Sequence, residues 1–124
     1  MSKLFQKFRF NVDLTKMNDL IDANRTHWSV GAKIKEDETL WVKLMAHEQR
    51  LKPFTQPVRI KWFWKYQHRG QDPDNIASQK KQILDGLKAA GVLPKDNLTF
   101  VVGFDGDEFC KSEDYGGEVH IYEI

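Results

Sequence analysis

An alternating stretch from Val58 to Tyr66 constrains the fold of this 124-residue chain more than any other feature. Every second residue is large and apolar: Val58, Ile60, Trp62, Trp64 and Tyr66. The residues between them include Arg59, Lys61, Phe63 and Lys65. Successive side chains of a strand point to opposite faces, so this pattern predicts a strand with one apolar and one basic face. We expect Trp62 and Trp64 in the core, although aromatic residues beside bases can also stack on nucleobases.

Weaker patterns predict the other elements of the fold. Alternation over 8–14 predicts a half-buried strand, and further strands are expected over 99–104 and 119–122. Helical patterns cover 18–25, 32–51 and 76–90, with Gly91 as a stop for the last one. Asp105-Gly106-Asp107-Glu108 is expected to form a hairpin turn. This order of elements predicts an α+β fold, in which a small mixed β-sheet packs with helices.

Length and cysteine content set limits on organisation. A chain of 124 residues is expected to form a single domain, residues 1–124. The single cysteine, Cys110, excludes an internal disulfide framework and agrees with a reducing compartment. The sequence contains no long apolar run, so we expect no signal peptide, no transmembrane helix and no membrane partner. The expected location is the cytoplasm.

The net charge of +1 conceals an asymmetric distribution. Residues 49–71 contain no acid and six bases: Arg50, Lys52, Arg59, Lys61, Lys65 and Arg69. Residues 105–124 contain seven acids and one base, Lys111. A basic centre favours binding of a polyanion, because displaced counterions drive association. The alternative is a solvated strand face with scattered charges.

Asp72-Pro73-Asp74 places two carboxylates one residue apart. The residue before a proline is pushed toward extended backbone, and we expect the proline to keep this segment out of a helix. Side chains two positions apart in an extended segment point to the same side, so Asp72 and Asp74 would converge. Such a pair favours a hard divalent cation such as Mg²⁺. Alternatively, Asp-x-Asp pairs cap helices or make turns.

A third carboxylate, Asp96, follows the helix predicted over 76–90. If the strand over 99–104 returns along the sheet, we expect Asp96 to lie beside Asp72 and Asp74. A divalent ion held there would activate a water molecule and neutralise charge on a phosphate oxygen. A nearby lysine would stabilise the developing charge. Lys80 falls near the apolar stripe of the helix, so its amine must reach solvent or meet a carboxylate.

Other catalytic patterns are missing from the sequence. Asp105-Gly106-Asp107-Glu108 lacks the length of a calcium-binding EF-hand loop. The four histidines, His27, His47, His68 and His120, lack metal-ligand spacing. The chain has neither a Gly-x-x-x-x-Gly-Lys phosphate loop nor a Gly-x-Ser-x-Gly motif. The carboxylates therefore remain the leading candidates for chemistry.

Three consecutive motifs together resemble the RusA family of Holliday-junction resolvases, which is common in bacteriophages and prophages. They are Asp72-Pro73-Asp74-Asn75, Ile83-Leu84-Asp85-Gly86-Leu87 and Gly91-Val92-Leu93-Pro94-Lys95-Asp96. The similarity is strong over about residues 69–102 and general elsewhere. It implies a RusA-like fold and a homodimer that binds four-way DNA junctions. It also implies paired cleavage of phosphodiesters with Mg²⁺ or Mn²⁺, in DNA recombination and repair within a bacterial cell.

The resemblance also implies roles for individual residues. Asp72, Asp74 and Asp96 match the essential metal-binding carboxylates, Asn75 matches the conserved asparagine, and Asp85 matches the helix aspartate. The catalytic lysine of the family lies one turn before that aspartate, which points to Lys81. The segment from Asn75 to Asp85 is three residues longer than in the shorter family form, so Lys80 remains an alternative. Lys95 replaces an acid that the family often carries next to the third aspartate.

The sequence therefore predicts a metal-dependent endodeoxyribonuclease acting on branched DNA. Its bases would position the phosphodiester backbone, and the candidates are Arg59, Lys61, Lys65, Arg69 and Lys80. The main alternative is a protein that binds branched or single-stranded DNA but does not cut it. Lys95 and the longer spacing before Asp85 favour that alternative.

Overall fold

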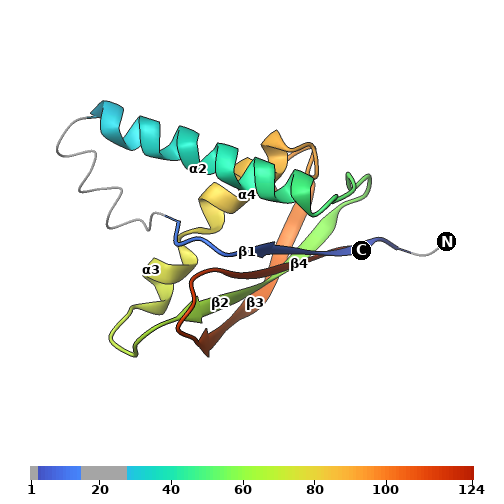
Figure 1. Cartoon of the computed structure of the whole chain (residues 1–124). Coiled ribbons are helices and arrows are strands. Elements are labelled where there is room, and N and C mark those ends of the chain that lie inside the picture. The colour runs from blue at the N-terminus through green and yellow to red at the C-terminus, as the bar shows by residue number, and fades with distance from the viewer. Residues whose placement is uncertain (1–2, 15–27) are drawn as a thin grey trace.

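The computed structural model describes residues 3–14 and 28–124 of the chain (Figure 1). Within these ranges the elements are β1 (Phe5–Phe10), α2 (Trp28–Glu48), β2 (Val58–Tyr66), α3 (Pro73–Ala77), α4 (Lys80–Ala89), β3 (Val101–Lys111) and β4 (Gly117–Glu123). The predicted α+β class with a small mixed sheet is confirmed. The helical segment expected over 18–25 lies outside the described residues. No described helix has the length and apolar character needed to cross a membrane.

The four strands form one sheet in the order β1-β4-β2-β3. β4 runs antiparallel to both β1 and β2, whereas β3 runs parallel to β2. A parallel neighbour requires a crossover connection, and α3 and α4 supply it between β2 and β3. The helices lie on one side of the sheet, which leaves the opposite face open (Figure 1).

The alternation that predicted β2 is confirmed side chain by side chain. Val58, Ile60, Trp62 and Trp64 are at most 1% exposed, and they point toward the helices. Arg59, Lys61 and Phe63 are half-buried on the open face, and Lys65 is exposed there. The strand therefore separates a dry apolar layer from a polar and aromatic one.

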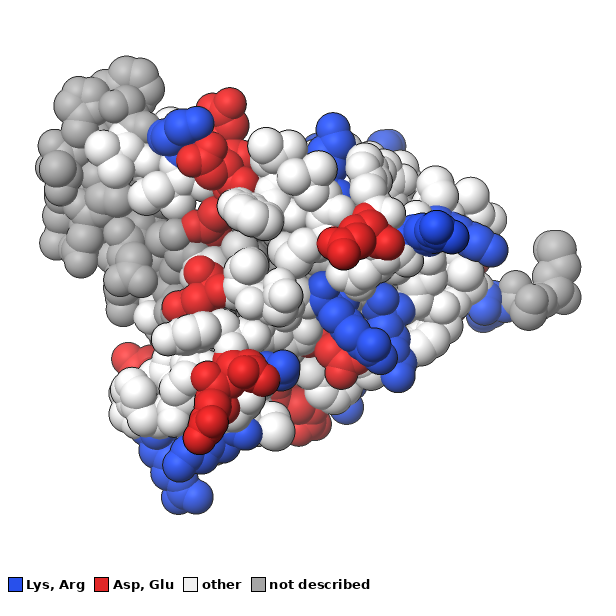
Figure 2. Space-filling model, in the orientation of Figure 1, with Lys and Arg blue, Asp and Glu red and all other residues white. Residues whose placement is uncertain are grey.

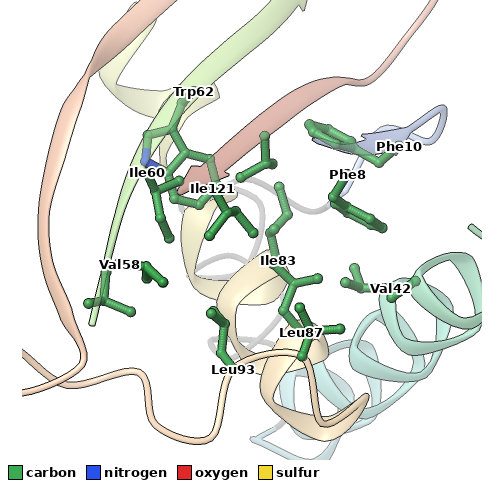
Figure 3. Packing of buried hydrophobic residues seen from close by; sticks show 14 of the residues in the cluster. Phe8, Phe10, Val42, Val58, Ile60, Trp62, Ile83, Leu87, Leu93 and Ile121 are labelled. Carbon is green, nitrogen blue, oxygen red and sulfur yellow. The ribbon is translucent and has the colours of Figure 1, made fainter. Parts of the chain in front are cut away.

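The core lies between the helix-facing side of the sheet and the helices α2 and α4 (Figure 3). Trp62 and Ile60 of β2 meet Ile121 of β4 there, while Ile83 and Leu87 project from α4. The rings of Trp62 and Trp64 stack at 5.5 Å with an interplanar angle of 3°. Both tryptophans are therefore core residues, as expected, and neither offers its ring to a ligand on the open face.

Gly86 allows α2 and α4 to pack closely. A Cβ atom placed on Gly86 would lie 2.3 Å from both Cβ and Cγ1 of Val42, which is fully buried in α2. Atoms at that distance overlap, so only glycine permits this separation of the helices. The glycine of the Leu84-Asp85-Gly86-Leu87 motif thus has a packing role.

The hairpin turn expected at Asp105-Gly106-Asp107-Glu108 is wrong, because these residues lie inside β3. Asp107 and Glu108 stand opposite Trp62 and Phe63 of β2. The register shifts between Ile60 and Trp62, where Gly106 adopts a φ of 114°. The acids remain in the strand because bases of β2 and α4 neutralise them and because glycine absorbs the irregular backbone.

The two edges of the sheet differ. At the β1 edge, the side chain of Gln49 accepts a hydrogen bond from the Arg9 N–H at 2.8 Å and donates one to the Arg9 carbonyl at 2.6 Å. Gln6 makes a similar pair of bonds with the backbone of Lys52. The Gln49 side chain thus satisfies the backbone of Arg9, which discourages another strand from pairing there, and the Gln6 bonds hold the segment around Lys52 beside β1. The opposite edge is β3, whose residues are exposed from Phe104 to Lys111.

Candidate functional site

The Asp72-Pro73-Asp74-Asn75 motif forms the beginning of α3, just beyond the end of β2. Asp72 is extended, as expected, with φ −80° and ψ 128°. Pro73, however, is the first helical residue and Asp74 lies in the first turn, so the expectation that the whole segment stays extended is wrong. Proline fits the first helical position, because its fixed φ suits a helix and its missing N–H would be unpaired there. The aspartates are exposed and lie at the positive end of a helix.

A small groove of about 390 Å³ lies beside this motif. Tyr66, Arg69, Pro73 and Phe109 are among its lining residues. Gln71 fixes the turn that carries Arg69, since its side-chain oxygen accepts the N–H groups of residues 67 and 68 at 2.8 and 3.2 Å. The structure thus places one exposed arginine in the groove next to the two aspartates.

Asp96 belongs to the connection from α4 to β3, and this connection lies at the end of the sheet where β2 begins (Figure 1). Its flanking segment is tied to the start of β2: the Val58 N–H donates to the Phe100 carbonyl at 2.8 Å. Asp72 follows the end of β2, a nine-residue strand that spans roughly 26 Å. The expectation that Asp96 lies beside Asp72 and Asp74 is therefore wrong. The cause is the parallel crossover, which returns the chain to the beginning of the sheet before β3 starts.

The described residues contain no cluster of three or more Asp, Glu, His or Cys side chains that could hold a metal ion. Asp96 instead lies 3.7 Å from the amine of Lys88. Asp72 and Asp74 remain the pair available to a cation at the start of α3. Because Pro73 and Asp74 are helical, the extended geometry that would point both carboxylates to one side is absent, and Asp74 accepts the Asn75 N–H at 3.0 Å. Mg²⁺ commonly takes one or two protein carboxylates and completes its shell with water and a substrate phosphate.

The two candidate lysines have different surroundings. The Lys80 amine lies 2.9 Å from Asp107 and sits over the rings of Trp62 and Phe104, at 5.6 and 4.9 Å from their centroids. Of the two outcomes expected for this amine, reaching solvent or meeting a carboxylate, the structure shows the second. Lys81 is 72% exposed and pairs with Asp85 one turn further along α4, at 3.0 Å. Lys80 is thus bound into the structure, whereas Lys81 is accessible.

Ion pairs occupy part of the basic strand face. Arg59 pairs with Asp105 at 2.6 Å, and Lys61 lies 3.6 Å from Glu108. These acids come from β3, which lies next to β2 in the sheet. Among the described residues, Lys65 has no carboxylate within 4.0 Å of its amine. On the face of the molecule that Figure 2 shows, basic and acidic side chains are interspersed.

The open face carries an aromatic group that the sequence patterns did not predict. His120 of β4 contacts Phe63 of β2 and Phe5 of β1, with ring centroids at 4.3 and 5.7 Å. Burial lowers the pKa of His120 below its ordinary value of 6.5, and nearby Lys7 and Lys61 act in the same direction against the carboxylate of Glu118. The alternation of β2 did place Phe63 on the basic face, but the sequence does not show which strands flank it.

Comparisons with known proteins add no family to this description. No protein-family model matches the chain, and no curated protein matches it. The resemblance of its motifs to the RusA family therefore stays a prediction from the sequence, and it enters below only as part of a proposal.

Proposed function

We propose that this chain is a metal-dependent endodeoxyribonuclease that cuts four-way branched DNA, as expected for a member of the RusA family. The observation that carries the proposal is the position of Asp72 and Asp74. Both carboxylates are exposed at the beginning of α3, next to a groove that holds Arg69. A phosphodiester entering this groove would meet the arginine, which can bind two phosphate oxygens at once.

Asp72 and Asp74 would hold Mg²⁺ or Mn²⁺ together with a phosphate of the DNA. The bound metal would supply an activated water and would neutralise charge on the phosphate. Arg69 would orient the phosphodiester, and Asn75 would support the turn that presents the aspartates.

Lys81 is the lysine that we assign to the transition state. Its amine is accessible, and Asp85 holds it on the polar side of α4. Lys80 has the role of a structural cation, because Asp107 and two aromatic rings surround its amine. The exposure of Lys81 and the ion pair of Lys80 support the choice of Lys81 over Lys80 in this proposal.

Asp96 takes part through a homodimer in this proposal. One chain keeps Asp96 at the end of the sheet opposite to Asp72, so the third carboxylate of a site would come from the second copy. If a two-fold axis sets the two sheets antiparallel, the sheet end that carries Asp96 in one chain would lie near the sheet end that carries Asp72 in the other. The same symmetry provides two sites, as a four-way junction with two equivalent strands to cut requires. Such an enzyme would act in recombination and repair in the cytoplasm of a bacterium, encoded by the host or by a phage.

A second candidate is a protein that binds branched or single-stranded DNA without cutting it. The separation of Asp96 from the other aspartates favours it, and so does Lys95, an exposed base where the family often has an acid. Lys65 and Arg69 would serve as DNA contacts in either case. Asp72 would then contribute to α3 only through its backbone carbonyl, which accepts the Ile76 N–H at 3.1 Å.

A synthetic four-way junction labelled on one strand discriminates these functions. The protein is incubated with the junction in Mg²⁺, in Mn²⁺ and in EDTA, and both binding and strand cleavage are measured. Nicks that require a metal ion support the nuclease. Saturated binding without nicks in either metal supports the non-catalytic protein and contradicts the nuclease.

A further inference from the structure

The open face of the sheet combines aromatic rings with basic side chains in adjacent strands. Lys7 of β1 and Lys61 of β2 stand directly opposite His120 of β4, one on each side. Phe5 and Phe63 lie diagonally next to the same histidine and contact its ring. A cation therefore flanks the aromatic group on each side.

The aromatic group is accessible and apolar. The side chain of His120 is 22% exposed, and Phe5 is 51% exposed. The lowered pKa of His120 keeps its ring neutral near pH 7, so the histidine extends the surface made by the two phenylalanines. The Lys61 amine lies 5.4 Å from the centroid of Phe63, which places positive charge beside a ring. Aromatic rings next to basic side chains are the features by which proteins bind unpaired nucleotides.

An open groove of about 880 Å³ continues from this surface. Lys7, Arg9 and Lys65 line it, together with two acids, Glu48 and Glu118. Arg9 is paired with Glu118 at 3.2 Å. Within the described residues neither Lys7 nor Lys65 has a carboxylate within 4.0 Å. The groove thus offers two unpaired amines to an anionic chain passing the aromatic surface.

We propose that the open face binds single-stranded DNA, with nucleobases stacked on Phe5 and on the Phe63 and His120 rings and with phosphates on the unpaired amines of Lys7 and Lys65. Stacking suits this surface because every base has a π-face, so no base-specific hydrogen bonds are needed. The lysines supply the attraction that a polyanion requires. This site deepens the proposed action on branched DNA, in which unpaired nucleotides occur, but it does not depend on the carboxylates.

Fluorescence anisotropy of a labelled single-stranded DNA of about 15 nucleotides tests this inference. The titration is done in EDTA, so that cleavage plays no part and a failed nuclease proposal leaves the result unaffected. Phe5→Ala and Phe63→Ala should each weaken binding roughly tenfold. Phe63→Trp should retain it. Trp41→Ala removes an aromatic residue that is 57% exposed on α2, and this matched control should bind like the wild type.

The salt dependence of the same titration tests the lysines. Lys7→Ala and Lys65→Ala should each reduce the slope of log affinity against log salt by about 0.7. Lys35→Ala, an exposed position of α2, should leave the slope unchanged. Circular dichroism confirms that each variant is folded.

Three results would overturn the inference. One is wild-type affinity in both phenylalanine variants, and a second is an equal loss in Trp41→Ala. The third is a loss of self-association in Phe5→Ala at unchanged DNA affinity, which would make the open face a contact between two copies of the chain. Junction cleavage by a protein that fails this binding test would leave the proposed nuclease function intact.

Discussion

The amine of Lys80 lies 2.9 Å from a carboxylate oxygen of Asp107, and the second oxygen of that carboxylate accepts the indole N–H of Trp64 at 2.8 Å. Both charged side chains are mostly buried, with 21% and 28% of their surface exposed. The pair therefore links α4, β3 and the core tryptophans. Because its amine is already paired with Asp107, Lys80 is not available to bind a DNA phosphate.

Lys80 and Lys81 should respond differently to substitution. Lys80→Ala leaves a mostly buried carboxylate without its cation and removes a charge from two rings, so we expect a loss of about 1–3 kcal/mol in the free energy of unfolding. Lys81→Ala should change stability by less than about 0.5 kcal/mol, since its pair with Asp85 is exposed. Urea denaturation measures both values. A stability loss in Lys81→Ala that equals the loss in Lys80→Ala would contradict the two roles.

Gly86→Ala should destabilise the packing of α2 against α4. Alanine is a better helix former by about 1 kcal/mol, but its Cβ would overlap with Val42, so we expect a net loss of about 2 kcal/mol. Gly91→Ala is the control: its φ is 79° and nothing lies within 4 Å of a Cβ placed there, so only backbone strain of about 1 kcal/mol applies. Thermal denaturation compares the two. Wild-type stability in Gly86→Ala would mean that the helices are further apart than described.

His120 should make stability depend on pH. Because burial lowers its pKa in the folded chain below the ordinary value of 6.5, the unfolded chain takes up a proton first as the pH falls. The His120 contribution to stability is therefore complete above about pH 6.5 and is lost progressively as the pH falls below it. His120→Phe should have a shallower decrease in melting temperature between pH 7.5 and 5. Parallel curves for the two proteins would show that His120 does not contribute.

Mixing two inactive variants tests whether Asp96 acts from the second copy. Asp74→Asn and Asp96→Asn should each be inactive on a four-way junction. In a mixed dimer, one site would combine the intact Asp74 of one chain with the intact Asp96 of the other, so cleavage should return after the variants are denatured and refolded together. If both residues served the same site within one chain, every site of the mixed dimer would lack one carboxylate. Continued inactivity would thus contradict the shared site.

Local patterns in the sequence predicted the parts of the fold that depend on neighbouring residues. The alternation over 58–66 gave the central strand with its correct buried face, and the residue before Pro73 is extended as expected. The position of Lys80 near the apolar stripe predicted that its amine would either reach solvent or meet a carboxylate, but not which of the two, nor that the partner would be Asp107. These features follow from side-chain periodicity and from backbone sterics, which the sequence shows directly.

Features that depend on strand order could not be read from the sequence. The acids of 105–108 resembled a turn because their partners, Arg59, Lys61 and Lys80, are distant in the chain and become neighbours only through β3. Asp96 was expected beside Asp72 because a helix followed by a strand was expected to return the chain to the end of β2. Because β3 runs parallel to β2, it begins near the start of β2 instead, and Asp96 lies there. The aromatic surface around His120 likewise arises from three strands, each of which looks ordinary alone.

The central claim is that Asp72 and Asp74 form the site that cuts a four-way junction. One measurement tests this claim most directly. Each strand of the junction is labelled in turn, and single-turnover cleavage in Mg²⁺ is followed for the wild type, Asp74→Asn and the control Asp37→Asn, which alters an exposed aspartate of α2. We predict symmetric nicks in two opposite strands by the wild type and the control, and a rate at least roughly a hundredfold lower in Asp74→Asn. Equal cleavage by Asp74→Asn, or no cleavage by a wild-type protein that saturates the junction, would contradict the claim.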